Sequence, residues 1–352
     1  MSECSTATRS EENPPGSFRR VPFEFRGDGA EFFRIWIVNI VLTVLTLGIY
    51  SAWATVRTNR YFYGNTYLDG DAFDYLASPV NILIGRAIAV FLLIIYNIVW
   101  QLMPGLGLLL SLALLIFIPQ VVLLSLRFGA RMTAWRGVRF GFGGDLIAAL
   151  KAYILWPIVG ILTLGLGLPY VWYRQNRFLI PNYRLGTTSA ETSAKADDFL
   201  IIIPVVLGIG FIGAILAFIM GSFLFTSDEP TGVALYSVVA GIGYLAIYVG
   251  IYAATRALYL HATYNNISLG NNSLRSSISV WGFFKVVMVN TLLTIITLGF
   301  FYPWAQVRTA RYLQNNLWVE AEDLESFVAD EQEKQNALGE EVGEAFDLGI
   351  GI

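Results

Sequence analysis

TLGIYSAWATVRTNRY, residues 46–61, returns in altered form from Thr163 and again from Thr297. Counted from the glycine of each copy, arginine falls at +9 and +12, an aromatic residue at +13 and asparagine at +17, and a basic residue stands at −14. Agreement at this many fixed offsets indicates three copies of one structural unit. The matching residues are Arg57, Arg60, Tyr61, Asn65 and Arg34 in the first copy, Arg174, Arg177, Phe178, Asn182 and Lys151 in the second, and Arg308, Arg311, Tyr312, Asn316 and Lys285 in the third.

The composition is that of a membrane protein. Of the 352 residues, 55% are hydrophobic and only 14% are charged, whereas a soluble domain carries about 25% charged residues. Four long apolar stretches contain no acidic residue, and Arg86 is their only basic one. Each is as long as the roughly 20 residues that a helix needs to cross a bilayer. They are residues 79–103, 105–126, 199–226 and 233–255.

These apolar stretches form two pairs that alternate with the three units. Short, turn-rich joints at Met103-Pro104-Gly105 and at residues 227–232 predict that each pair is an antiparallel helical hairpin. The predicted fold is an all-α integral membrane protein, in which three repeated helical units, re-entrant or single-span, alternate with two transmembrane helical hairpins. The expected order is a disordered N-terminal tail at 1–20, repeat unit one at 21–78, transmembrane hairpin one at 79–128, repeat unit two at 137–190, transmembrane hairpin two at 198–256, repeat unit three at 275–320 and an acidic C-terminal tail at 321–352.

Two flanking features complete the pattern. Phe23-Glu-Phe25-Arg-Gly27-Asp28 alternates and ends in glycine, which predicts a strand or turn at the membrane surface. A twin at residues 140–145 precedes the second unit, but the third unit lacks this lead-in. The C-terminal tail contains apolar residues spaced for a modestly amphipathic helix, and we expect the tail to be solvated or to dock onto basic loops. Those residues are Leu324, Phe327, Val328 and Leu338.

The distribution of basic residues decides between the two topologies. Nineteen Lys and Arg remain when Arg34, Arg86, Lys151 and Lys285 are set aside as embedded. If each unit crosses the membrane once, the two sides carry ten and nine of them, which is no positive-inside bias. If each unit dips in and returns, all nineteen lie on one side. We therefore predict four full spans and three re-entrant or interfacial hairpins, with both termini cytoplasmic.

The motifs in combination resemble a known family. The Phe-x-Phe-x-Gly lead-in, the Thr-Leu-Gly-Ile-Tyr-Ser-x-Trp-Ala-x-Val-Arg segment, the Asn65-to-Gly70 segment and the closing Gly343-to-Asp347 segment are similar to YjgN-like bacterial inner-membrane proteins. The resemblance covers nearly the whole chain from Phe23. It implies a multi-pass protein of the bacterial inner (cytoplasmic) membrane, and it carries over no catalytic or ligand residue.

The basic residues of the units are the candidate ligand sites. Residues three apart share one helical face, so each arginine pair could bind a lipid headgroup or another anionic ligand. The alternative is that they anchor helix ends at the interface. Arg86, inside a predicted span, could reach the headgroups or pair within the bundle. The candidates are Arg86, Arg57, Arg60, Arg174, Arg177, Arg308 and Arg311.

The same residues narrow the classes of function. Cys4 is the sole cysteine and His261 the sole histidine, so we expect no metal site, no thiol chemistry and no cofactor. No nucleotide-binding loop and no catalytic constellation stand out, so an enzyme is not expected. Internal repeats and broken helices weakly favour a channel or transporter for a small solute. The alternative is a non-transporting scaffold or lipid-interacting protein. Membrane lipids are the expected partners, nucleic acid is not, and the sequence names no protein partner.

Overall fold

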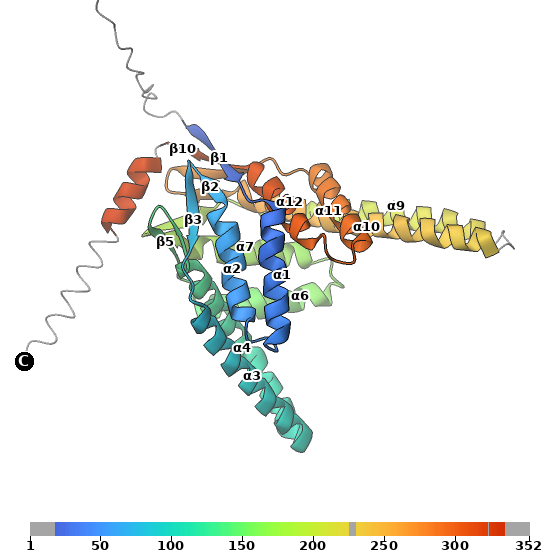
Figure 1. Cartoon of the computed structure of the whole chain (residues 1–352), viewed down its shortest axis with the longest axis horizontal. Helices are drawn as coiled ribbons and strands as arrows, with labels where there is room; N and C mark the ends of the chain where they lie inside the picture. Colours follow the sequence, from blue (N-terminus) through green and yellow to red (C-terminus); the bar gives the residue numbers. More distant parts are fainter. Residues whose placement is uncertain (1–17, 225–229, 323, 335–352) are drawn as a thin grey trace, which may run out of the picture.

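A closed antiparallel β-barrel organises the chain. The computed structural model describes residues 18–224, 230–322 and 324–334. Within these ranges ten strands close in the order β1-β10-β9-β8-β7-β6-β5-β4-β3-β2. Every odd strand leads into a helical hairpin and the next even strand returns from it, so the hairpins all leave the barrel at one end (Figure 1). The other end carries the short turns between hairpins.

The expectation of an all-α fold is therefore wrong. The strands are only three to seven residues long and are separated by long apolar helices, so their alternation is faint beside the helical signal. Their hydrogen-bonding partners become adjacent only when the ring closes. The runs that begin at Phe23 and at Phe140 were the clearest signals, and they lie in β1 and β5 and the turns that follow them.

The architecture is a fivefold repeat of strand, helical hairpin and strand. The two apolar hairpins occupy the same place in the barrel as the three units recognised from sequence. The repeats are β1 (Arg19–Phe25), α1 (Gly29–Leu45), α2 (Ser51–Gly64), β2 (Thr66–Leu68); β3 (Asp71–Tyr75), α3 (Pro79–Leu102), α4 (Pro104–Arg131), β4 (Thr133–Trp135); β5 (Val138–Phe142), α5 (Leu146–Leu150), the π-helical turn η1 (Lys151–Leu155), α6 (Trp156–Leu162), α7 (Leu168–Asn182), β6 (Tyr183–Leu185); β7 (Thr188–Thr192), α8 (Ala196–Leu200), α9 (Ile202–Leu224), α10 (Pro230–Tyr264), β8 (Ile267–Leu269); and β9 (Asn272–Ser276), α11 (Val280–Ile296), α12 (Tyr302–Asn315), β10 (Leu317–Ala321).

One backbone hydrogen bond recurs where every hairpin joins the barrel. The carbonyl of the residue just before each even strand accepts from the N–H just after the odd strand of the same repeat. In three units the acceptor is the asparagine at +17, whose side-chain amide also donates to the carbonyl four residues earlier. The five bonds are Arg26 to Asn65 (2.9 Å), Leu76 to Met132 (2.8 Å), Gly143 to Asn182 (2.9 Å), Ser193 to Asn266 (3.0 Å) and Ser277 to Asn316 (2.9 Å).

The break predicted at Thr-Leu-Gly is present in all three units. At the first, Leu47 and Gly48 have φ of 48° and 91°, and the Thr46 hydroxyl donates to the Leu42 carbonyl while accepting from the Tyr50 N–H. The same bonds recur at Thr163 and Thr297. The three leucines of these turns are 90–94% exposed. Each unit is thus a helical hairpin with an apolar tip.

Four helical segments are long and apolar enough to cross a membrane: Pro79–Leu102, Pro104–Arg131, Ala196–Ile219 and Ser237–Tyr264. They correspond to the four predicted spans, and α3 packs against α4 and α9 against α10. The two long hairpins diverge as they leave the barrel (Figure 1). Since both ends of every unit join one end of one barrel, the units are hairpins and not single crossings. Of the predicted joint at 227–232, residues 227–229 lie outside the described residues.

A ring of apolar side chains lies inside the barrel and belongs to a buried cluster that also contains Val21, Val138 and Ala321. The residues come from equivalent positions of all five repeats, because the register is the same in each flanking strand pair. Phe73 stacks against Phe23, Trp135 and Phe140, with ring centroids 6.1–6.4 Å apart. The paired positions are Phe23 with Leu68, Phe73 with Trp135, Phe140 with Leu185, Ala190 with Leu269 and Leu274 with Val319.

A helix at 324–334, which we call the capping helix, covers the turn end of the barrel. Leu324 and Val328 are 7% and 5% exposed and pack into the same apolar cluster as the ring. This part of the acidic tail is therefore folded against the barrel. The predicted N-terminal tail as far as residue 17, and the acidic tail from 335, lie outside the described residues.

Candidate functional site

Three of the predicted basic residues meet in one cavity of unit two. The cavity has a volume of about 480 Å³ and lies between the π-helical turn η1 and α7. Lys151 is the basic residue at −14, and Arg174 and Arg177 are those at +9 and +12. No acidic side chain lines this cavity, whose other lining residues are Ala148, Ala152, Trp156, Tyr173, Phe178 and Asn182.

The three cations are held differently. The Arg174 guanidinium lies over the Trp156 ring, 4.5 Å from its centroid. Such a contact fixes the cation and leaves its N–H edges free to donate. Arg177 and Lys151 are exposed, and the Arg177 guanidinium is 3.5 Å from the Tyr173 hydroxyl. The cavity thus offers three positive charges to an anion.

The position of Lys151 follows from an irregular helix. Pro157 has no N–H, so it cannot close a helical turn behind it. The Trp156 N–H bonds instead to the Lys151 carbonyl, five residues earlier. That leaves the Ala152 carbonyl without a helical donor, and Gln175 Nε2 donates to it at 3.3 Å. A widened turn of this kind is frequent at functional sites, and here it forms one wall of the cavity.

The arginines at +12 in the other units have a structural role. Arg311 donates to the Gly27 carbonyl at 2.7 Å, and Arg60 donates to the Ala77 carbonyl at 3.3 Å. Arg127, at the same place in hairpin one, donates to the Gly144 carbonyl at 2.7 Å. Each bond reaches the strand-to-helix junction of the next repeat. These residues therefore join neighbouring repeats, which the spacing alone could not reveal.

The arginines at +9 are less constrained outside unit two. Arg57 is exposed and donates to the Tyr50 hydroxyl at 3.0 Å. Arg308 is half-buried, and its side chain makes no hydrogen bond or ion pair with any residue in the described ranges. Neither lies in a basic cavity like that of unit two.

Arg86 pairs inside the helical bundle. Its Nη1 donates to Ser51 Oγ at 2.5 Å and its Nη2 to Thr55 Oγ1 at 2.9 Å. Both hydroxyls belong to α2, so Arg86 ties hairpin one to unit one. A charge within an apolar helix is costly unless polar groups surround it, and these hydroxyls supply that environment.

A second, uncharged cavity adjoins repeats one, four and five. It has a volume of about 710 Å³ and is lined by α2, α10, α11 and α12. Phe62 lines both this cavity and a smaller one of about 320 Å³ at the base of the barrel. Phe23 and Phe73 of the apolar ring also line the smaller cavity. No sequence motif marked these residues, because they come from repeats that meet only when the ring closes.

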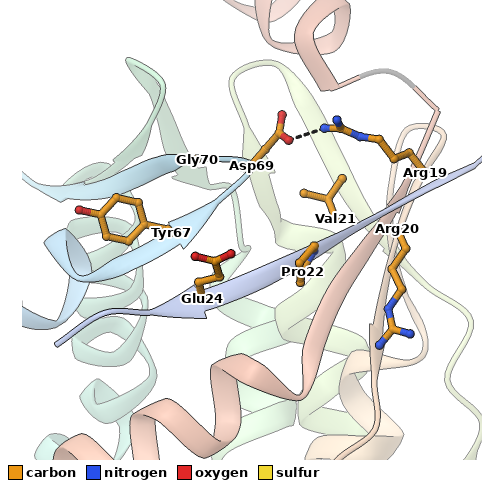
Figure 2. Close-up of a pocket in the computed structure, with 8 residues that line it drawn as sticks. All are labelled: Arg19, Arg20, Val21, Pro22, Glu24, Tyr67, Asp69 and Gly70. Carbon is orange, nitrogen blue, oxygen red and sulfur yellow. Dashed lines mark hydrogen bonds and ion pairs between the residues drawn. The ribbon is translucent and has the colours of Figure 1, made fainter. Parts of the chain in front are cut away.

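The turn end of the barrel carries a shallow charged pocket of about 250 Å³ (Figure 2). Most of its charged groups are paired: Arg19 bonds to Asp69, which Arg136 also contacts at 3.1 Å, and Glu24 pairs with Arg26 at 2.9 Å. The Arg20 guanidinium lies over the Trp318 ring, 3.8 Å from its centroid. The Arg19 side chain is also half exposed to solvent. This pocket therefore offers little unsatisfied charge to a ligand.

Glu331 is the one nearly inaccessible charged side chain in the described ranges, with 1% of its surface exposed. Its carboxylate accepts from the Thr187 N–H (2.6 Å), the Thr187 hydroxyl (2.9 Å), the Thr188 hydroxyl (2.6 Å) and Lys334 Nζ (3.1 Å). Burial alone would raise the pKa of Glu331, but these donors outweigh it and hold the pKa at about 2. The bond network fixes the capping helix to the β6–β7 turn.

Comparison with known proteins agrees with this architecture. Residues 20–345 match a family described as bacterial protein of unknown function (DUF898). The chain belongs to this family. It is also 28% identical, over 366 aligned positions, to the inner membrane protein YjgN of Salmonella typhimurium strain LT2, covering 88% of this chain and 91% of that protein.

Two further relatives have the same printed name as the Salmonella protein. The inner membrane proteins YjgN of Escherichia coli O157:H7 and of Escherichia coli strain K12 are each 29% identical over 208 positions, or 59% of this chain and 50% of those proteins. No solved structure matches the chain. The resemblance drawn from the motifs is confirmed, and the protein is a multi-pass protein of the inner membrane.

Proposed function

We propose that this inner-membrane protein binds the phosphate of anionic phospholipids in the cavity formed by Lys151, Arg174 and Arg177. The observation that carries the proposal is the convergence of three cations in a cavity with no acidic lining residue. Two of them are exposed and the third is oriented by Trp156. An arginine guanidinium suits a phosphate because its N–H groups match the spacing of two phosphate oxygens.

The position of the cavity within unit two supports a lipid rather than a soluble anion. Lys151 and Arg177 lie toward the barrel end of their helices, whereas Leu164 at the opposite tip is 94% exposed. An apolar tip favours insertion among acyl chains, and the basic residues then fall near the headgroups. Each basic residue near an anionic surface contributes about 1 kcal/mol. Three of them correspond to about a hundredfold preference for an anionic over a zwitterionic lipid.

Transport of a small solute is the competing hypothesis, and one observation opposes its simplest form. A conduit along the barrel axis would have to pass the ring of apolar side chains around Phe73. We therefore place the lipid-interacting function first. That the chain is not an enzyme, and that nucleic acid is not a partner, remain predictions from the sequence.

Native mass spectrometry in lipid nanodiscs tests the proposal. The test variant combines Lys151→Gln, Arg174→Gln and Arg177→Gln. The control combines Arg34→Gln, Arg57→Gln and Arg308→Gln, which remove the same charge from the other units. We expect the parent and control to retain phosphatidylglycerol in preference to phosphatidylcholine, and the test variant to lose that preference. If the test variant retains phosphatidylglycerol as well as the parent does, binding in this cavity is refuted. If both variants lose the preference equally, the protein responds to net charge alone and the proposal is also wrong.

A further inference from the structure

The uncharged cavity beside α11 has polar groups that lack partners. Asn290 is 6% exposed, and its Nδ2 donates to the Ala305 carbonyl (3.1 Å) and to Thr309 Oγ1 (3.0 Å). Its Oδ1 is buried and accepts no hydrogen bond. Thr291 on the same helix, and Thr58 and Asn59 on α2, also line the cavity, and their side chains make no hydrogen bond within the described ranges. A buried amide without a partner costs free energy.

A purely structural role accounts for only part of this arrangement. Asn39 stands at the equivalent place in unit one, where its Nδ2 donates to the Ala54 carbonyl at 3.4 Å and its Oδ1 is likewise unpaired. The amide donor thus holds the two helices of a hairpin together in both units. Asn290, unlike Asn39, lines a cavity of about 710 Å³ with other unpaired polar side chains. The cavity is the feature that calls for an occupant.

The lining specifies the chemistry of that occupant. No Asp, Glu, Lys or Arg lines the cavity, so a charged group would lack a counter-charge. Asn290 Oδ1 and the threonine hydroxyls can accept from a hydroxyl group. Much of the remaining wall is apolar and suits hydrocarbon chains, as at Tyr252, Phe283, Val287, Ile295 and Leu313.

The route of entry favours an amphiphile. Phe62 also lines the smaller cavity at the base of the barrel, together with Phe23 and Phe73. Other lining residues of the uncharged cavity, such as Thr294 and Tyr302, extend along α11 and α12 toward the apolar tip. This extension toward the tip favours entry of an occupant from the membrane side.

We propose that this cavity binds a lipid whose headgroup is an uncharged alcohol, such as a diacylglycerol. The hydroxyl is donated to the asparagine and threonine side chains of α11 and α2, and the acyl chains lie against the aromatic and aliphatic wall. The site is separate from the basic cavity of unit two, so it does not depend on phospholipid binding there.

Binding of dioleoylglycerol to the full chain in phosphatidylcholine nanodiscs tests this, measured by native mass spectrometry. The test variant is Asn59→Leu with Thr291→Val, because these partly exposed side chains make no internal bond whose loss would disturb folding. Gln120→Leu with Thr43→Val, which removes two partly exposed polar side chains outside the cavity, is the control. We expect binding to weaken about 30-fold in the test variant, the equivalent of two hydrogen bonds, and to persist in the control.

Two ligand comparisons sharpen the result. Triolein, which lacks the free hydroxyl, should not compete, and glycerol alone should not compete at matched concentration. Equal binding by parent and test variant, or equal competition by triolein, would overturn the proposal. Displacement by glycerol would identify a soluble polyol as the ligand and overturn the assignment to a lipid.

Discussion

Replacing Glu331 by glutamine should release the capping helix from the barrel. The pKa of this carboxyl is lowered from 4.5 to about 2 by hydrogen bonds from Thr188, Thr187 and Lys334 that exceed the opposing effect of burial. A tenfold change in proton affinity is worth about 1.4 kcal/mol. The ionised carboxylate therefore stabilises the docked helix by about 3 kcal/mol relative to an undocked helix whose glutamate is solvated.

The sign of the pH dependence follows from the direction of the shift. Because the pKa is lower in the docked state, the stabilisation is complete above about pH 4.5 and is lost as the pH falls toward 2. Glu331→Gln removes the charge at every pH. We expect it to weaken docking by up to about 3 kcal/mol at pH 7, and to abolish the acid dependence between these two values.

Hydrogen exchange of the amides in 324–334, followed by mass spectrometry, measures this directly. The expected loss of protection at pH 7 is up to about a hundredfold. Glu333→Gln is the matched control, since it removes one carboxylate from the exposed face of the same helix. If the two variants exchange at the same rate, the Glu331 network does not hold the helix and the reasoning is wrong.

Two further outcomes follow from the barrel. Phe73→Ala should destabilise the protein by about 3 kcal/mol, because it leaves a cavity among Phe23, Trp135 and Phe140, and Phe73→Leu should destabilise it less. Thermal unfolding in detergent measures both effects. Equal melting temperatures for the parent and Phe73→Ala would contradict a packed barrel interior. In a Cys4→Ser background, single cysteines that replace Asp71, Ser189 and Asn271 should react with a membrane-impermeant thiol reagent from one side of the membrane only. A cysteine that replaces Gly105 should react from the other side. Reaction of the first three from opposite sides would contradict a single barrel on one side of the membrane.

The sequence contained the helical organisation almost completely. The sequence predicted four spans, three broken hairpins and the positions of the breaks. These features depend on local composition and on the turn chemistry that is repeated at Thr46, Thr163 and Thr297. The grouping of Lys151 with Arg174 and Arg177 could also be expected in part, since their offsets within the unit are constant. The offsets did not show that arginines at the same position have different roles. Arg177 lines a cavity in unit two, whereas Arg60 and Arg311 form hydrogen bonds between repeats.

The barrel could not be read from the chain, for a physical reason. A strand as short as Thr66–Leu68 has no stability of its own, and its two partners, β1 and β3, are set by closure of the ring. The Phe-x-Phe pattern occurs twice in the sequence, but in the folded protein the corresponding interior positions are occupied in all five repeats. The folded protein also shows that the two apolar hairpins are equivalent to the three units. The uncharged cavity and the Glu331 network likewise depend on side chains far apart in sequence. Local periodicity determined which segments are helices, and long-range closure alone decided that their hairpins extend from one end of a single barrel.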